Sequence, residues 1–164
     1  MININKDLIQ KLSDRIEAGQ DSELRAWARD LHATDVAEIL GQMRSEPASY
    51  LYRLLDPEVR ADVLIELDED QRAELLSAMT AEEIAGGVLG KLDSDDATDV
   101  VAELPPNKAE EVIGHLEDDE RASDIRDLLA YQEGTAGAMM AKELVKVQAD
   151  WTVTRTIREI RRQA

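Results

Sequence analysis

Apolar residues lead a unit that recurs about every twelve residues through the middle of the chain. The leading positions hold leucine or methionine, and they are Leu31, Met43, Leu55, Leu67, Met79, Leu92, Leu104 and Leu116. The spacing slips once, to thirteen residues between Met79 and Leu92. Self-similarity at a fixed period is the sequence signature of a repeat architecture. The pattern therefore predicts an array of short, similar helices.

Helix start signals follow the leading residues. They combine Asp or Thr, Pro and acidic residues at 56–58, 68–70, 80–82, 93–95, 105–107 and 117–119. Asp and Thr are good N-caps, Pro suits the first helical position, and the helix dipole favours acidic residues in the first turn. Helices this short do not persist alone, so each must bury its apolar stripe against its neighbours. We expect a mainly α fold, a superhelix of the kind that armadillo repeats form.

The two ends of the chain differ from the repeats. Apolar spacing predicts an opening helix over 6–17 and a second helix from Asp21. After residue 130 comes a segment of small residues, then a predicted strand at 144–147 and a predicted helix over 152–162. One strand and one helix are too little for a domain. We expect residues 1–130 to form one domain and 131–164 to be a linker with an incomplete second domain of a longer protein.

The net charge and the composition of the chain limit the kinds of partner that it can bind. The chain has 36 acidic and 19 basic residues and a formal net charge of -17, which repels nucleic acid. It contains no cysteine, which excludes disulfides, thiolate zinc sites and thiol nucleophiles and agrees with a cytosolic location. No stretch approaches the roughly 20 apolar residues of a membrane span, so we expect a soluble piece. Converging carboxylates favour hard cations such as magnesium and calcium.

Enzyme motifs are missing from the sequence. The glycines at 86–91 are one residue short of a phosphate loop, and Leu92 stands where Ser or Thr would be needed. An EF-hand at 93–104 fails at its third ligand, its turn glycine and its final glutamate. His32 and His115 lie at helix junctions without a nucleophile pattern, so surface or capping roles are expected. We predict that the chain is not an enzyme.

Carboxylate pairs offer a weak metal signal. Asp95 and Asp99 are four residues apart, so a helix places both on one face, where their repulsion is relieved if a cation lies between them. A small residue followed by a carboxylate recurs in the repeats, at Ala37-Glu38, Ala61-Asp62, Ala73-Glu74 and Thr98-Asp99. Asp62 and Asp99 therefore share one repeat phase. An acidic surface residue remains the alternative for each of them.

The acidic repeats and the segment after them resemble the cytosolic N domain of MgtE magnesium transporters. The most specific piece is a Tyr-x-Glu-x-Thr-Ala-Gly-x-x-Met segment, which runs from Tyr131 to Met140. The stretches 144–147 and 151–160 resemble the first strand and helix of a CBS domain. Gly134 departs from the family pattern, which usually has an acidic residue there. The resemblance covers nearly the whole chain from about residue 20.

This resemblance implies a regulatory function. In the family, magnesium bound weakly between the acidic N domain and CBS domains of the same or the partner subunit holds a homodimeric pore closed. The family's metal positions match Asp62, Asp95 and Asp99. The resemblance also implies a place at the cytoplasmic face of the inner membrane, attached through a transmembrane domain that this chain lacks. On these grounds the chain is expected to bind magnesium poorly by itself and to transport nothing.

A metal-independent interaction module is the alternative reading. Superhelices of short helices commonly present a concave surface to partner proteins, and similar repeats occur in the flagellar motor switch protein FliG. The CBS-like tail favours the transporter, because such a tail has no place in a motor switch protein.

Overall fold

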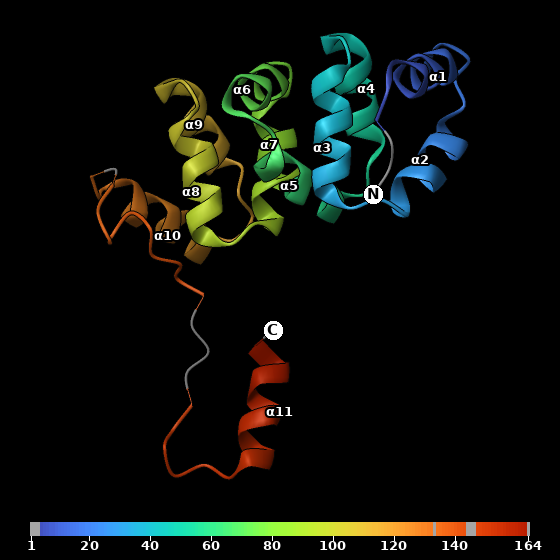
Figure 1. Ribbon diagram of the computed structural model, residues 1–164. Coiled ribbons are helices and arrows are strands. Elements are labelled where there is room, and N and C mark those ends of the chain that lie inside the picture. The colour runs from blue at the N-terminus through green and yellow to red at the C-terminus, as the bar shows by residue number, and fades with distance from the viewer. Residues whose placement is uncertain (1–3, 133, 144–146, 164) are drawn as a thin grey trace.

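The computed structural model describes residues 4–132, 134–143 and 147–163, and all regular structure in these ranges is helical. Figure 1 shows the helices stacked one after another into a superhelix, with the last helix below it. In chain order they are α1 (Lys6–Glu17), α2 (Asp21–Arg29), α3 (Ala33–Gln42), α4 (Ser45–Leu54), α5 (Pro57–Glu66), α6 (Glu69–Ser77), α7 (Ala81–Gly87), the 3₁₀ turn η1 (Leu89–Lys91), α8 (Ser94–Ala102), α9 (Pro106–Gly114), α10 (Asp119–Leu129) and α11 (Val153–Gln163).

The leading residues of the repeats lie at the helix junctions, as the twelve-residue period predicts. The backbone N–H of Leu55 donates to the carbonyl of Tyr52 at 3.2 Å, which closes the last turn of α4. The same bond to the third residue back recurs at Leu31, Met43, Leu67, Met79, Leu104 and Leu116. Their side chains are buried or pack against the buried core. Each leading residue thus ends one helix and anchors the turn into the next.

The single thirteen-residue unit coincides with the 3₁₀ turn. Helix α7 is only 7 residues long, and it is followed by Val88 and η1 before the next helix begins. Leu89 is fully buried and Leu92 is 4% exposed, so the extra residue is absorbed without losing the apolar stripe. The glycine-rich stretch at 86–91 therefore forms a helix end and a tight turn.

Predicted N-caps are found where the sequence places them, but not all of them use their side chains. Asp56, Asp68, Thr80, Asp93 and Asp118 are all N-cap residues. The side chains of Asp68, Thr80 and Asp118 accept backbone N–H bonds, and Thr80 forms a reciprocal capping box with Glu83. Asp93 makes no such bond at the start of α8.

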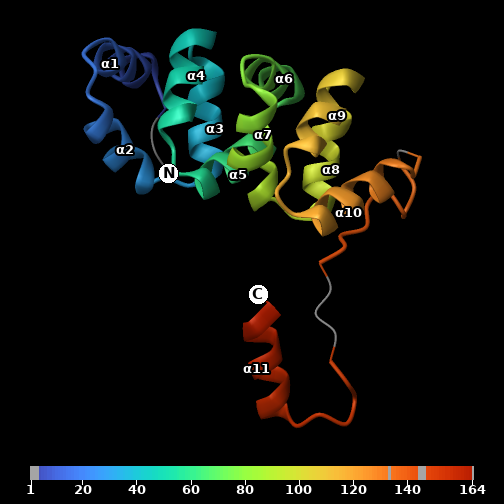
Figure 2. The same cartoon turned by 180° about the vertical axis from the view of Figure 1, so that it is seen from behind.

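Helices pack chiefly against the next helix but one. Helix α3 packs on α5, α5 on α7, α7 on α9, α4 on α6 and α8 on α10. The alternation produces the stacked rows visible from both sides in Figures 1 and 2. The small residues of the repeat lie in this core at Ala37, Ala61 and Thr98, whereas Ala73 is exposed. The buried side chains form one continuous apolar cluster along the array.

The segment after α10 turns back toward the superhelix. Gly134 has a φ of 76°, a conformation that other residues rarely adopt, which accounts for glycine at the position where the resembling family carries an acidic residue. Gly137 lies so close to the ring of Tyr131 that a Cβ atom there would fall 2.3 Å from it. These glycines allow the compact turn that the family-like motif forms.

A helix is present near the C-terminus where the sequence predicts one, and its assignment to a CBS domain stays a prediction. Helix α11 matches the expected helix over 152–162, and it lies apart from the superhelix in both views (Figures 1 and 2). Most of the strand expected at 144–147 lies outside the described residues, and Val147 is not in a strand. In the ranges that the structure describes, no helix combines the length and the apolar character that crossing a bilayer requires.

Candidate metal site

Two of the three candidate metal ligands, Asp95 and Asp99, lie on helix α8. Asp95 and Asp99 lie one turn apart on it, Asp95 partly buried and Asp99 exposed. Their backbone neighbours Ser94, Ala97 and Thr98 are buried, which fixes the helix against the core. Two carboxylates on one face of a rigid helix offer the hard oxygen ligands that magnesium prefers.

Electrostatic repulsion is visible within this cluster. Partial burial and the negative charges of Asp95, Asp93 and Asp99 raise the pKa of the Asp96 carboxyl above its ordinary value. The helix N-terminus favours negative charge, yet it does not cancel this effect. A cation beside these carboxylates would relieve the repulsion, so the donor set of α8 fits a divalent ion.

Asp62, the third candidate, is an exposed residue on α5. Within the part of the chain that the structure describes, no three or more histidine, aspartate or glutamate side chains gather closely enough to hold a metal ion. Asp62 thus does not form a complete site with Asp95 and Asp99 in this chain. The assignment of the three residues to magnesium stays a prediction.

A contact at the start of α8 escaped the sequence reasoning. The backbone N–H and the hydroxyl of Ser94 both donate to the carboxylate of Glu143, at 2.9 and 2.8 Å. The two residues are 49 positions apart, and nothing local in the sequence marks the pair. The chain leaving α10 thereby returns to the helix that carries Asp95 and Asp99.

The contact with Ser94 favours the ionised form of the Glu143 carboxyl. Partial burial pushes the pKa of Glu143 upward, but the bonds from the Ser94 hydroxyl and backbone, a further backbone bond and the charge of Arg121 outweigh it. The net result is a pKa below the ordinary value for glutamate. The carboxylate is therefore ionised at neutral pH and acts as the N-terminal cap of α8.

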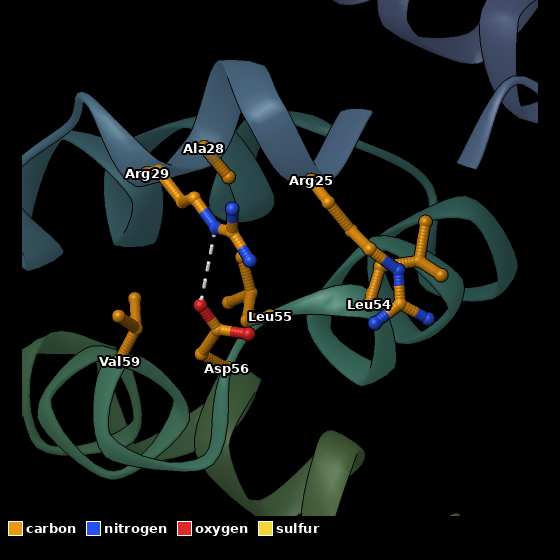
Figure 3. A pocket seen from close by; sticks show the side chains of 7 residues that line it. All are labelled: Arg25, Ala28, Arg29, Leu54, Leu55, Asp56 and Val59. Atoms are coloured by element: carbon orange, nitrogen blue, oxygen red, sulfur yellow. Dashed lines mark hydrogen bonds and ion pairs between the residues drawn. The ribbon is translucent and has the colours of Figure 1, made fainter. Parts of the chain in front are cut away.

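A hollow between α2 and the α4–α5 junction has a structural explanation (Figure 3). Arg29 Nε donates to Asp56 Oδ2 across it at 3.4 Å, and both side chains are largely exposed. An exposed ion pair of this kind contributes little to stability. The remaining lining residues are Arg25, Ala28, Leu54, Leu55 and Val59. The hollow is a contact between repeats and does not assemble a reactive centre.

The solved structures that resemble this chain include parts of magnesium transporters. One is described as the soluble part of a magnesium transporter, with a TM-score of 0.79, 25% identity, and coverage of 96% of this chain and 62% of that one. Another is described as the cytosolic domain of the Mg²⁺ channel MgtE in complex with ATP, with a TM-score of 0.81, 25% identity, and coverage of 94% and 63%. The chain thus spans less than two thirds of either structure.

The family comparison identifies the superhelix. A comparison with curated proteins finds no match. The family model described as the MgtE intracellular N domain matches residues 31–134, more than half of the chain. This match agrees with the location expected at the cytoplasmic side of a membrane. It begins at Leu31, the first leading residue of the repeats, and extends past α10 into the Tyr131 motif. The chain belongs to the MgtE intracellular N domain family.

Proposed function

We propose that this chain is the magnesium-sensing regulatory part of an MgtE-type magnesium transporter. In this proposal, Mg²⁺ bridges Asp95 and Asp99 on α8, and Asp62 on α5, to CBS domains of the same or the partner subunit of a homodimer. The bridged arrangement keeps the pore closed. Residues 1–130 are the N domain, and 131–164 are the linker and the beginning of the first CBS domain.

The observation that carries the proposal is the crowding of carboxylates on α8. Partial burial is the largest cause of the raised pKa of Asp96, and the charges of Asp95, Asp93 and Asp99 raise it further. A face with this much negative charge repels another acidic surface when magnesium is scarce. A cation that binds only the compact arrangement shifts the population toward it, and by the same linkage compaction raises the affinity for the cation.

The chain offers only part of a coordination shell. Asp95 and Asp99 supply two carboxylates, and magnesium commonly uses one or two protein carboxylates and keeps several waters. The remaining protein ligands would come from the CBS side. We therefore propose weak binding in the isolated chain and tighter binding in the longer protein. ATP is named for one similar structure, and we propose no ATP site in the superhelix.

Transport measurements test this function. In the transporter that contains this chain, Asp95→Asn combined with Asp99→Asn should raise the cytosolic magnesium concentration that closes the pore. Helical content should not change, because Asp99 is exposed and Asp95 is only partly buried. Glu69→Gln is a matched control, since it removes an exposed carboxylate from α6. Unchanged gating in the double variant would reject the site and favour the metal-independent interaction module.

A further inference from the structure

Residues 142 and 143 connect the exit of the chain to two helices at once. Glu143 accepts both bonds from Ser94 on α8. The backbone N–H of Lys142 donates to the Ser94 hydroxyl at 2.7 Å. The ammonium group of Lys142 lies 3.3 Å from Asp127 and 3.7 Å from Asp124, both on α10. We call this set of five contacts the clasp.

The clasp caps the first backbone N–H of α8. Ser94 is the first residue of α8, so its N–H has no partner within the helix, and Glu143 satisfies it. Ser94 is 1% exposed, and its carbonyl accepts a bond from the buried Thr98 hydroxyl at 2.6 Å. A buried polar group loses stability when it is left unpaired. The start of α8 therefore depends on a residue that lies beyond the superhelix.

Charge supports the same arrangement. The acidic side chains of Asp124 and Asp127 raise the pKa of Lys142, chiefly through the hydrogen bond to Asp127. Residues 1–130 contain 32 of the 36 acidic residues and 13 of the 19 basic residues. A basic residue at 142 is thus attracted to α10, and it brings the adjacent carboxylate of Glu143 to the positive end of α8.

We propose that the clasp is a joint that couples α8 to the chain leaving the superhelix. Glu143 and Lys142 act as positioning residues: they hold the exit segment against α8, so that α8 and residues 141–143 move together. Asp95 follows Ser94 directly, so the joint lies next to the candidate metal ligands Asp95 and Asp99 on α8. Its role in magnesium sensing rests on the function proposed above, whereas its existence as a joint does not.

Amide exchange tests the joint without any metal. In the 164-residue chain, Glu143→Ala should accelerate exchange of the Ser94 amide by about tenfold, the factor expected when a charge-assisted hydrogen bond is lost. Asp150→Ala, which removes an exposed carboxylate from the same tail, should leave that amide unchanged. Glu143→Gln keeps the length of the side chain and should give an intermediate rate. An unchanged Ser94 rate in Glu143→Ala would overturn the proposal.

Distance measurements provide the second readout. The chain has no cysteine, so spin labels at Ala102→Cys on α8 and Ala141→Cys before the clasp are unique. Both positions are exposed. A narrow distance distribution is expected in the otherwise native chain, and a broad one in Lys142→Ala with Glu143→Ala. Equal widths in the two chains would overturn the joint.

A separate experiment tests whether the clasp is coupled to closure of the pore. In the transporter, Glu143→Ala should raise the magnesium concentration needed for closure although Asp95 and Asp99 are intact. Loss of Ser94 protection with unchanged magnesium dependence would overturn the coupling. Failure of the Asp95→Asn and Asp99→Asn test alone would reject the proposed sensing function, because the exchange and distance readouts contain no metal.

Discussion

Arg72 and Glu103 form a two-pronged ion pair between α6 and the C-terminal end of α8. Arg72 Nη2 lies 2.8 Å from Glu103 Oε1, and Arg72 Nε donates to Oε2 at 2.9 Å. Arg72 Nη1 also donates to the carbonyl of Ile65 on α5, at 3.3 Å. One guanidinium group therefore joins three helices. The clasp secures the beginning of α8, and this pair secures its end.

The Arg72–Glu103 pair should contribute to stability more than the exposed pairs do. Its side chains are 18% and 22% exposed, so solvent screens the charges less, and bidentate charged bonds are the strong ones. We expect Arg72→Ala and Glu103→Ala each to lower the free energy of unfolding by about 1–3 kcal/mol, with a coupling energy of about 1 kcal/mol in a double-mutant cycle from urea denaturation.

The control for this pair is Lys91 with Glu58. Their atoms are 3.8 Å apart, and the side chains are 44% and 84% exposed. The same cycle on this pair should give a coupling energy below about 0.5 kcal/mol. Equal coupling energies for the two pairs would contradict the structural role of Arg72.

Tyr52 should stabilise the α4–α5 contact through its hydroxyl, which donates to the carbonyl of Arg60 at 3.0 Å. The residue is 1% exposed, and burial raises the pKa of Tyr52 far above that of a free tyrosine. Tyr52→Phe should cost about 1 kcal/mol in thermal or urea unfolding. Tyr50→Phe loses a bond to Asp21 at a residue that is 39% exposed, and it should cost less. The reverse order would contradict this account.

A substitution at Leu92 tests whether the leading residues of the repeats belong to the core. It is 4% exposed between η1 and α8, and an aspartate there would be a buried charge without a partner. Leu92→Asp should destabilise the chain by about 3 kcal/mol or more, which circular dichroism during urea titration would detect. Leu129→Asp makes the same chemical change at a residue that is 38% exposed, and it should have a much smaller effect. If Leu92→Asp retains native stability, the core assignment is wrong.

The lowered pKa of Glu143 makes the stability of the folded chain depend on pH. Its pKa is lower in the folded chain than the ordinary value of 4.5, so the folded state binds the proton less readily than the unfolded state. The contribution of Glu143 to stability is then fully present above the ordinary value and is lost as the pH falls through the folded pKa. The stability difference between the native chain and Glu143→Gln should shrink as the pH is lowered from 7 to 3. A difference that grows on acidification would contradict the clasp.

Sequence periodicity predicts the superhelix well because its determinants are local. The leading residue, the N-cap and the apolar stripe of each unit lie within twelve residues. Leu55, Asp56 and Pro57, for example, are the leading residue, the N-cap and the first helical residue of one unit. The helix over 6–17 and the helix near the C-terminus follow from the same spacing. Asp95 and Asp99 could also be selected locally, since they are one turn apart.

Long-range contacts could not be predicted in this way. Ser94 and Glu143 are 49 residues apart, and Arg72 and Glu103 are 31 apart. Each partner is one of many charged or polar residues in a chain with 36 acidic side chains. Tertiary packing brings Arg72 on α6 to the end of α8, and the segment after α10 brings Glu143 to its start. The relation of Asp62 to the α8 pair is also a question of packing, and its role stays a prediction.

In the proposed function, magnesium holds the acidic superhelix against the CBS region. The most direct test is a magnesium titration followed by limited proteolysis of the protein extended through the whole CBS region, with the 164-residue chain treated in parallel. We expect protection at millimolar magnesium in the longer protein alone, and loss of that protection in Asp95→Asn with Asp99→Asn. Absence of protection in both proteins would contradict the claim and indicate a metal-independent interaction module.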